Sequence, residues 1–359
     1  MASPEIVDTP EEAAQHERAP LIVREPLAAF LDSQGLGSGP VEAERIGEGH
    51  SNVTYLLRRG ETRLVLRRPP RPPLPPSAHD VLREARLLGA LEGTNARTPR
   101  ILATCDDESV LDVPFYVMEE EHGHVITSEV PEALDSEEDR ARMGDDLVDA
   151  LVEVHAVDWR AAGLEGFAKP TGYLERQLRR FNGLWEHNKT RELPIVAQVA
   201  DWLASNLPES PEATIVHGDY RLGNVMVGPD SPGRVVAVFD WELATIGDPL
   251  ADVGYLTVTW VGREDPADTM FSNLSAVTRE PGFPSREEMV ARYEERSGRT
   301  MKALNWYQTL ALWKATVFME GNYKSYIAGA SDDEYLAMFD EGVPALAEKA
   351  WEIARGGGD

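Results

Sequence analysis

The sequence contains a single cysteine, Cys105, so an intramolecular disulfide framework is excluded. No apolar run reaches about 18 residues, the length that crosses a lipid bilayer as a helix. The acidic N-terminus also lacks the apolar segment of a secretory signal. We therefore expect a cytoplasmic protein without a membrane partner.

Positive charge is scarce, because 35 Lys and Arg residues face 62 Asp and Glu residues and give a formal net charge of −27. Nucleic acids and anionic membranes are bound through Lys and Arg, so this balance argues against both as partners. It would suit a cationic acceptor such as an aminoglycoside. An acidic surface also serves solubility alone, and composition does not separate these two interpretations.

Carboxylate and amide side chains are spaced regularly in the stretch from Ile215 to Glu242. Asp219 precedes Asn224 by five residues, and Asp240 ends an apolar run. The segments 224–228 and 235–239 both have the pattern of short strands, and the connection between them is rich in turn-forming residues. Antiparallel pairing would bring Asn224 and Asp240 to one end of a hairpin, where two oxygen ligands suit Mg²⁺. The alternative is a buried hairpin with polar caps, since Asp and Asn are common turn residues.

This spacing matches the catalytic loop and the metal-binding Asp of protein kinases. Residues 217–219 read His-Gly-Asp instead of His-Arg-Asp, and residues 240–242 read Asp-Trp-Glu instead of Asp-Phe-Gly. The combination resembles the aminoglycoside phosphotransferase family of small-molecule kinases. The resemblance implies that Asp219 is the catalytic base and that Asn224 and Asp240 hold Mg²⁺ against the phosphates of ATP.

A glycine-rich turn lies upstream of this stretch. Gly47 and Gly49, with Ser51 and Asn52, resemble the loop that covers the phosphates in a kinase. Glycines allow backbone N–H groups to approach phosphate oxygens closely. A Gly-x-Gly sequence between strands is also common as an ordinary turn.

Arg67 occupies the strand position at which a kinase carries its phosphate-contacting Lys. Arginine also binds phosphate, in a bidentate geometry. Glu84, in a helix expected over residues 80–91, is the candidate partner of Arg67. The alternatives are a solvated charge at the edge of the sheet for Arg67 and an exposed helix charge for Glu84.

The segment 115–120 resembles the kinase hinge, so we expect adenine contacts near Met118, Glu119 and Glu121. As a peptide it has equally the pattern of a buried strand with a polar end. Further on, the resemblance implies structural roles. We expect His155 to bond the backbone of the catalytic loop, and Asp248 and Asp252 to brace that loop.

The resemblance extends from Ile46 to Tyr255 and implies an α+β, bilobal protein-kinase-like fold with a mixed-sheet N-lobe and a mainly helical C-lobe. We expect a flexible arm over residues 1–20, the N-lobe with its nucleotide-binding loop over 21–120, and the C-lobe with the catalytic loop and acceptor site over 121–359.

Three motifs favour one branch of the family: residues 49–55, 66–70 and 239–249. That branch includes the kinase-like domains of multidomain acyl-CoA dehydrogenases, which act on hydroxyacyl-CoA substrates. We therefore expect phosphate transfer from ATP to the hydroxyl of a small molecule of that type. The alternatives are an aminoglycoside kinase and, because the usual Lys is absent, a nucleotide-binding pseudokinase that serves as a scaffold.

Overall fold

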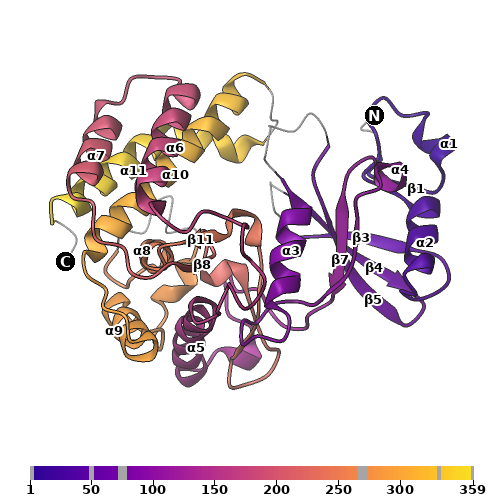
Figure 1. Ribbon diagram of the computed structural model, residues 1–359, viewed down its shortest axis with the longest axis horizontal. Coiled ribbons are helices and arrows are strands. Elements are labelled where there is room, and N and C mark those ends of the chain that lie inside the picture. Colours follow the sequence, from indigo (N-terminus) through magenta and orange to yellow (C-terminus); the bar gives the residue numbers. More distant parts are fainter. Residues whose placement is uncertain (1–3, 48–51, 72–78, 266–273, 330–332, 357–359) are drawn as a thin grey trace. The chain divides into compact units, whose positions relative to one another are not determined.

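The computed structural model describes residues 4–47, 52–71, 79–265, 274–329 and 333–356. Contacts within the chain divide it into two units. The first comprises residues 1–94 and 98–122, and the second comprises residues 95–97 and 123–359. The large sheet belongs to the first unit and most of the helices belong to the second (Figure 1).

A five-stranded antiparallel sheet forms the centre of the first unit, with the strand order β3-β4-β5-β7-β6. Its strands are β3 (Glu42–Ile46), β4 (Val53–Arg59), β5 (Thr62–Arg68), β6 (Ile101–Cys105) and β7 (Phe115–Glu119). A two-residue turn that contains Gly60, at φ +58, joins β4 to β5, as hairpins with positive φ prefer. A second, parallel pair joins β1 (Ile6–Val7) to β2 (Ile22–Val23), so the unit contains both kinds of strand pairing.

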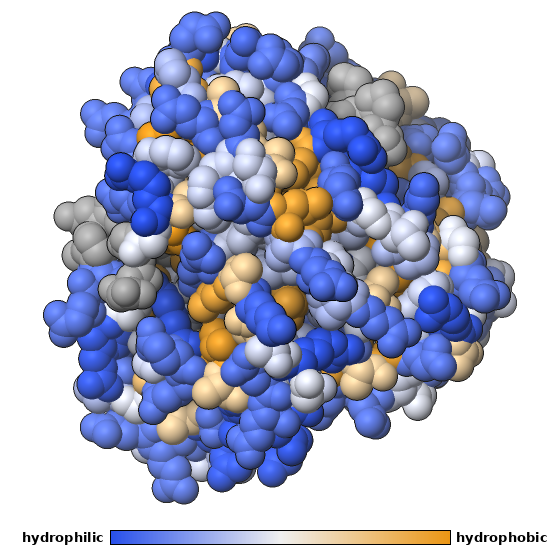
Figure 2. Space-filling view, turned by 60° about the vertical axis from the view of Figure 1, so that its left-hand side comes forward, coloured by the Kyte–Doolittle hydropathy of each residue, from blue (hydrophilic) through white to orange (hydrophobic). Residues whose placement is uncertain are grey.

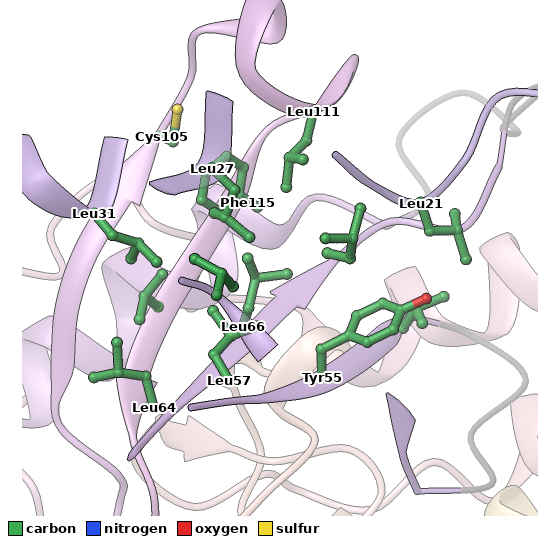
Figure 3. Close-up of a cluster of buried hydrophobic side chains, with 14 residues drawn as sticks. Leu21, Leu27, Leu31, Tyr55, Leu57, Leu64, Leu66, Cys105, Leu111 and Phe115 are labelled. Atoms are coloured by element: carbon green, nitrogen blue, oxygen red, sulfur yellow. The ribbon is translucent and has the colours of Figure 1, made fainter. Parts of the chain in front are cut away.

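Apolar side chains from α2 and from the sheet form the core of the first unit. Figure 3 shows Leu27 and Leu31 of α2 in one cluster with Tyr55 and Phe115 of the sheet. The rings of Phe30 and Phe115 meet edge to face at 5.1 Å. The helices of this unit are α1 (Pro10–Ala13), α2 (Arg24–Ser33), α3 (Val81–Leu91) and α4 (Glu108–Leu111).

The N-terminal segment, expected as a flexible arm over residues 1–20, contains a strand and a helix. Ile6 and Val7 pair with Ile22 and Val23, and the Val7 side chain is buried. Residues 6–7 of the expected arm thus form β1, and residues 10–13 form α1. The flexibility of the arm stays a prediction.

Helices make up most of the second unit: α5 (Glu137–His155), α6 (Tyr173–Asn188), α7 (Pro194–Ser205), α8 (Leu250–Thr259), α9 (Arg286–Ser297), α10 (Leu304–Ile327) and α11 (Phe339–Ala354). Short 3₁₀ segments span Glu132–Leu134 (η1), Leu222–Asn224 (η2), Trp241–Leu243 (η3), Ala276–Arg279 (η4) and Glu334–Met338 (η5). The long helix α10 packs against α6, α7, α8 and α11 (Figure 1). It therefore forms the centre of the unit.

Sequence signals set the ends of these helices. Ser136 caps α5 by accepting from the backbone of Asp139 at 3.0 Å, and Ser285 forms a reciprocal capping box with Glu288 at the start of α9. Pro194 occupies the first turn of α7, where its missing N–H costs nothing. The helix boundaries therefore follow from local chemistry.

Two short antiparallel strand pairs complete the second unit. One joins β8 (Thr214–Val216) to β11 (Thr245–Gly247), and the other joins β9 (Val225–Val227) to β10 (Val235–Val238). They carry the polar residues that the sequence singled out.

The visible face in Figure 2 is mostly hydrophilic, and hydrophobic residues occupy only small patches on it. This agrees with the sequence, in which 27% of the residues are charged. Within the described ranges, no helix combines the length and the apolar character needed to span a bilayer.

Candidate active site

The β9–β10 hairpin brings Asn224 and Asp240 to the same end. β9 begins directly after Asn224, and β10 ends two residues before Asp240. The backbone N–H of Phe239 donates to the carbonyl of Asn224 at 2.8 Å. The hairpin predicted from the sequence is therefore confirmed, although both strands are shorter than expected.

Asn224 holds the carboxylate of Asp219, and Tyr255 and Arg221 lie near it. Asn224 Nδ2 donates to Asp219 Oδ2 at 2.8 Å and to the Asp219 backbone oxygen at 2.8 Å. Burial, together with the nearby carboxylate of Asp219, raises the Tyr255 pKa well above its ordinary value. Arg221 Nε lies 3.9 Å from Asp219 Oδ1. The Asp219 side chain keeps 24% of its surface exposed, so it is fixed in position and still accessible.

Asp252, on α8, fixes the backbone before Asp219. Its Oδ2 accepts from the N–H of His217 at 2.7 Å, and its Oδ1 accepts from the N–H of Gly218 at 2.8 Å. Gly218 has φ +89, a conformation that side-chain-bearing residues rarely adopt. The expected bracing role of Asp252 is confirmed. Asp248 accepts from the N–H of Leu250 at 2.9 Å and from the hydroxyl of Tyr307 at 2.8 Å, so these two bonds join α8 to α10.

His155 contacts Asp252, which in turn binds the backbone of the catalytic loop. The prediction that His155 itself bonds that backbone is therefore wrong. His155 Nε2 lies 3.1 Å from Asp252 Oδ2, and Nδ1 lies 2.8 Å from the hydroxyl of Tyr293. Burial lowers the pKa of His155, partly opposed by Asp252. Burial acts to raise the pKa of Asp252, but the bond to His155 and the neighbouring donors outweigh it and lower that pKa. A neutral imidazole therefore donates to an ionised carboxylate.

Asp240 lies at a sharp bend between β10 and η3. It has φ +63 and ψ +60, the left-handed region that Asp tolerates better than most residues. The preceding carbonyl, of Phe239, is 2.8 Å from His217 Nε2. The bend is thus hydrogen-bonded to the loop that carries Asp219.

Arg67 and Glu84 form an ion pair within the first unit. Arg67 Nε lies 3.1 Å from Glu84 Oε2, and the side chains are only 13% and 2% exposed. Arg67 also lies within hydrogen-bonding distance of Thr54 Oγ1, at 3.4 Å. Because neither side chain is solvated, the alternatives of an edge charge and an exposed helix charge are wrong.

The other residues predicted to bind nucleotide lie in or beside the sheet of the first unit. Gly47 has φ +76, while Gly49 and Ser51 fall outside the described residues. Asn52 is buried, with its Oδ1 3.2 Å from His79 Nδ1. This contact orients the Asn52 side chain toward His79.

Two of the predicted hinge residues, Met118 and Glu119, end β7, and the third, Glu121, follows it. Met118 is buried in the sheet, and Glu119 donates its backbone N–H to the carbonyl of Arg100 at 3.0 Å. Glu121 is half-buried, and burial, with a smaller contribution from Glu119, raises the pKa of its carboxyl. The adenine contacts stay a prediction.

A cavity of about 280 Å³ opens within the second unit, and Asp219 forms part of its wall. The catalytic loop, α8 and α10 supply most of the lining. The lining is largely apolar, with Leu310, Phe318 and Met319 among its residues. Lys314 brings a cationic group into the same wall.

The sequence model of the Phosphotransferase enzyme family matches residues 42–296. The chain belongs to this family. The predicted resemblance, which rested on the loop and hairpin motifs, is confirmed.

Among curated relatives of this phosphotransferase, acyl-CoA dehydrogenase family member 11 of Gallus gallus is 32% identical over 325 residues. The match covers 89% of this chain and 41% of the relative. The chain thus spans less than half the length of the acyl-CoA dehydrogenases that it matches. The predicted closeness to this branch is confirmed.

Among solved structures, a protein from Ralstonia eutropha assigned as an aminoglycoside phosphotransferase superimposes with a TM-score of 0.77 at 29% identity. The superposition covers 92% of this chain and 98% of that one. The aminoglycoside phosphotransferase APH(4)-Ia, in a ternary complex with AMP-PNP and hygromycin B, shares the fold with a TM-score of 0.59 at 18% identity, and covers 93% of this chain and 99% of its own. The predicted bilobal kinase-like fold, with mixed strand pairing and a mainly helical second part, is therefore confirmed.

Two residues of this phosphotransferase site were not found by sequence reasoning. Tyr255 and Lys314 both line the cavity that contains the predicted base. Tyr255 lies at the end of the stretch that resembles the family, but it is not part of any of the quoted motifs. A signal existed for Lys314, since it is a lone cation between buried residues in the middle of α10.

Proposed function

We propose that this chain transfers the terminal phosphate of ATP to a hydroxyl group of a small molecule. The observation that carries the proposal is the placement of Asp219, which is fixed by Asn224 and exposed to the cavity. A carboxylate held in this way can accept and orient the proton of an attacking hydroxyl.

Asn224 and Asp240 would hold Mg²⁺. The Asn224 amide nitrogen is engaged by Asp219, so its oxygen is the atom left for a cation. A carboxylate and an amide oxygen at one end of a hairpin suit the hard Mg²⁺ ion. In the described part of the chain, no cluster of three or more His, Cys, Asp or Glu side chains could hold a metal ion. This fits Mg²⁺, which typically takes one or two protein ligands and completes its shell with substrate phosphates and water. The bound ion would neutralise phosphate charge.

Arg67, oriented by Glu84, would contact the phosphates, and Gly47, Gly49, Ser51 and Asn52 would form the covering loop. Met118, Glu119 and Glu121 would lie near the adenine. The complex of APH(4)-Ia with AMP-PNP supports the use of a nucleoside triphosphate in this fold.

For the acceptor we propose a hydroxyacyl-CoA-type metabolite. The similarity to proteins named acyl-CoA dehydrogenases supports this class. The second candidate is an aminoglycoside, which the hygromycin B complex and the acidic net charge favour. A pseudokinase is less well supported, because the Arg67–Glu84 pair keeps a cation and carboxylate where a kinase has Lys and Glu.

The test is transfer of label from terminally labelled ATP, with Mg²⁺, to two acceptor pools. One pool contains hydroxyacyl-CoAs and free hydroxy acids, and the other contains kanamycin and hygromycin B. We expect label on the first pool that depends on Mg²⁺. Label only on the second pool would show that the acceptor is an aminoglycoside and not a hydroxyacyl-CoA. ATP binding without label on either pool would favour the pseudokinase.

A further inference from the structure

The cavity beside Asp219 combines an apolar wall with one lysine. Leu310, Phe318 and Met319 of α10 face the cavity together with Lys314. The predicted base also lines this cavity. A molecule bound here would therefore meet an apolar surface, the carboxylates of Asp219 and Asp252, and the cationic groups of Arg221 and Lys314.

Lys314 is not neutralised by an ion pair in the described part of the chain, where no carboxylate oxygen lies within 4.0 Å of its Nζ. Its ammonium instead lies 5.1 Å from the ring centroid of Phe181. The nearby carboxylates are engaged elsewhere: Asp252 accepts from His155 and two backbone amides, and Asp219 accepts from Asn224. The cation is available to a ligand.

The surroundings of Lys314 make its charged form less favourable than it is in water, although the ammonium still predominates at pH 7. Burial lowers the pKa of Lys314 to about 8, opposed by Asp252 and Asp219 and reinforced by Arg180. An anion bound against the ammonium would reverse this effect, because an opposite charge favours the protonated form. Binding of an anion and protonation of Lys314 therefore support each other.

We propose that Lys314 is the specificity-determining residue of the acceptor site, and that it pairs with an anionic group of an acceptor whose apolar portion packs on α10. This inference rests on the proposed function. The anion can be a free carboxylate or a phosphate of a CoA ester. Polycationic acceptors such as aminoglycosides would place amines against Lys314, which costs binding energy through like-charge repulsion.

The test measures binding alone, by calorimetry at pH 7, with four probes: octanoate, octanol, octylamine and octanoyl-CoA. We expect wild type to bind octanoate or octanoyl-CoA more tightly than octanol, and octylamine most weakly. Lys314→Met should weaken binding of the anionic probe by about 10-fold or more, the range for a charged hydrogen bond, and leave octanol unchanged. Lys314→Arg should retain most of the affinity.

The matched control is Lys349→Met, since Lys349 lies on α11 with its side chain 53% exposed and away from the cavity lining. It should bind all four probes as wild type does. In lysine-side-chain NMR, the Lys314 pKa should rise when the anionic probe binds.

Equal affinities for octanol and the anionic probes would overturn the inference, as would wild-type affinity in Lys314→Met or no binding of either anion. Lys314-dependent binding without any phosphate transfer would leave the inference standing and reject the proposed function. Phosphate transfer that does not depend on Lys314 would support the proposed function and reject the role of Lys314.

Discussion

Asn224 Nδ2 lies 2.8 Å from Asp219 Oδ2, so the proposed metal ligand and the proposed base are joined directly. This bond sets the orientation of both side chains. It leaves the Asn224 oxygen for a cation and holds the Asp219 carboxylate in the wall of the cavity. Partners that orient a ligand often matter nearly as much as the ligand itself.

Asn224→Asp separates the two roles of this residue, because an aspartate still offers metal-binding oxygens but no longer donates to Asp219. Two carboxylates would then lie side by side and share protons. We expect kcat to fall by about 100-fold, a typical loss for a displaced general base, while a requirement for Mg²⁺ persists. Steady-state kinetics over a range of Mg²⁺ concentrations would check this. A variant with wild-type kcat would show that the Asn224–Asp219 bond has no part in catalysis.

The His155–Asp252 pair predicts how stability depends on pH. Since burial lowers the His155 pKa in the folded state, the unfolded chain takes up a proton at this residue before the folded protein does. The contribution is therefore fully present above the unfolded value of 6.5 and is lost as pH falls below it. One such proton changes the free energy of unfolding by up to about 1.4 kcal/mol per pH unit.

Urea unfolding of wild type and His155→Gln between pH 7.5 and pH 5, a range of about 2.5 units, checks this linkage. The variant should be less stable at pH 7.5 and should lose less stability on acidification. Parallel pH profiles for the two proteins would contradict the buried neutral imidazole.

Much of this arrangement could be predicted from the sequence, and the reason is local. Asp219, Asn224 and Asp240 occur at fixed spacing around two short strands, so the hairpin alone brings two of them together. Arg67 and Glu84 were paired by analogy with the kinase positions. Lys314 and Tyr255 reach the same cavity only through the packing of α8 on α10, which no spacing in the sequence encodes.

Arg67→Met tests whether the cation of β5 binds phosphate. The variant would leave Glu84, which is 2% exposed, without its cation, a change that typically costs about 3–5 kcal/mol of stability. We also expect weaker ATP binding, and Arg67→Lys should keep part of both properties.

The double variant Arg67→Met with Glu84→Met distinguishes stability from function. It should regain stability, because both buried charges are gone, without regaining ATP affinity. Thermal unfolding and ATP titration of all three variants provide the measurements. Recovery of ATP affinity in the double variant would show that Arg67 is structural only.

Gly254→Ala tests the close packing of α8 on α10. A Cβ at Gly254 would lie 2.5 Å from Tyr307 Cβ and 2.7 Å from its backbone carbon, which forces the helices apart. We expect a loss of about 1–3 kcal/mol in the free energy of unfolding, as for other overpacked sites.

Gly183→Ala is the matched control, since a Cβ there has no atom within 4 Å and the residue lies in α6. It should be neutral or gain up to about 1 kcal/mol from the better helix propensity of Ala. Equal midpoints for the two variants in urea would contradict the tight α8–α10 contact.

The central claim is that Asp219 acts on the acceptor hydroxyl and not on the nucleotide. The most direct measurement is single-turnover phosphate transfer by Asp219→Asn, with ATP affinity measured in parallel and Asp201→Asn, an exposed change on α7, as control. The account predicts a loss of about 100-fold or more in the transfer rate with nearly unchanged ATP affinity. Transfer at the wild-type rate by Asp219→Asn would contradict it.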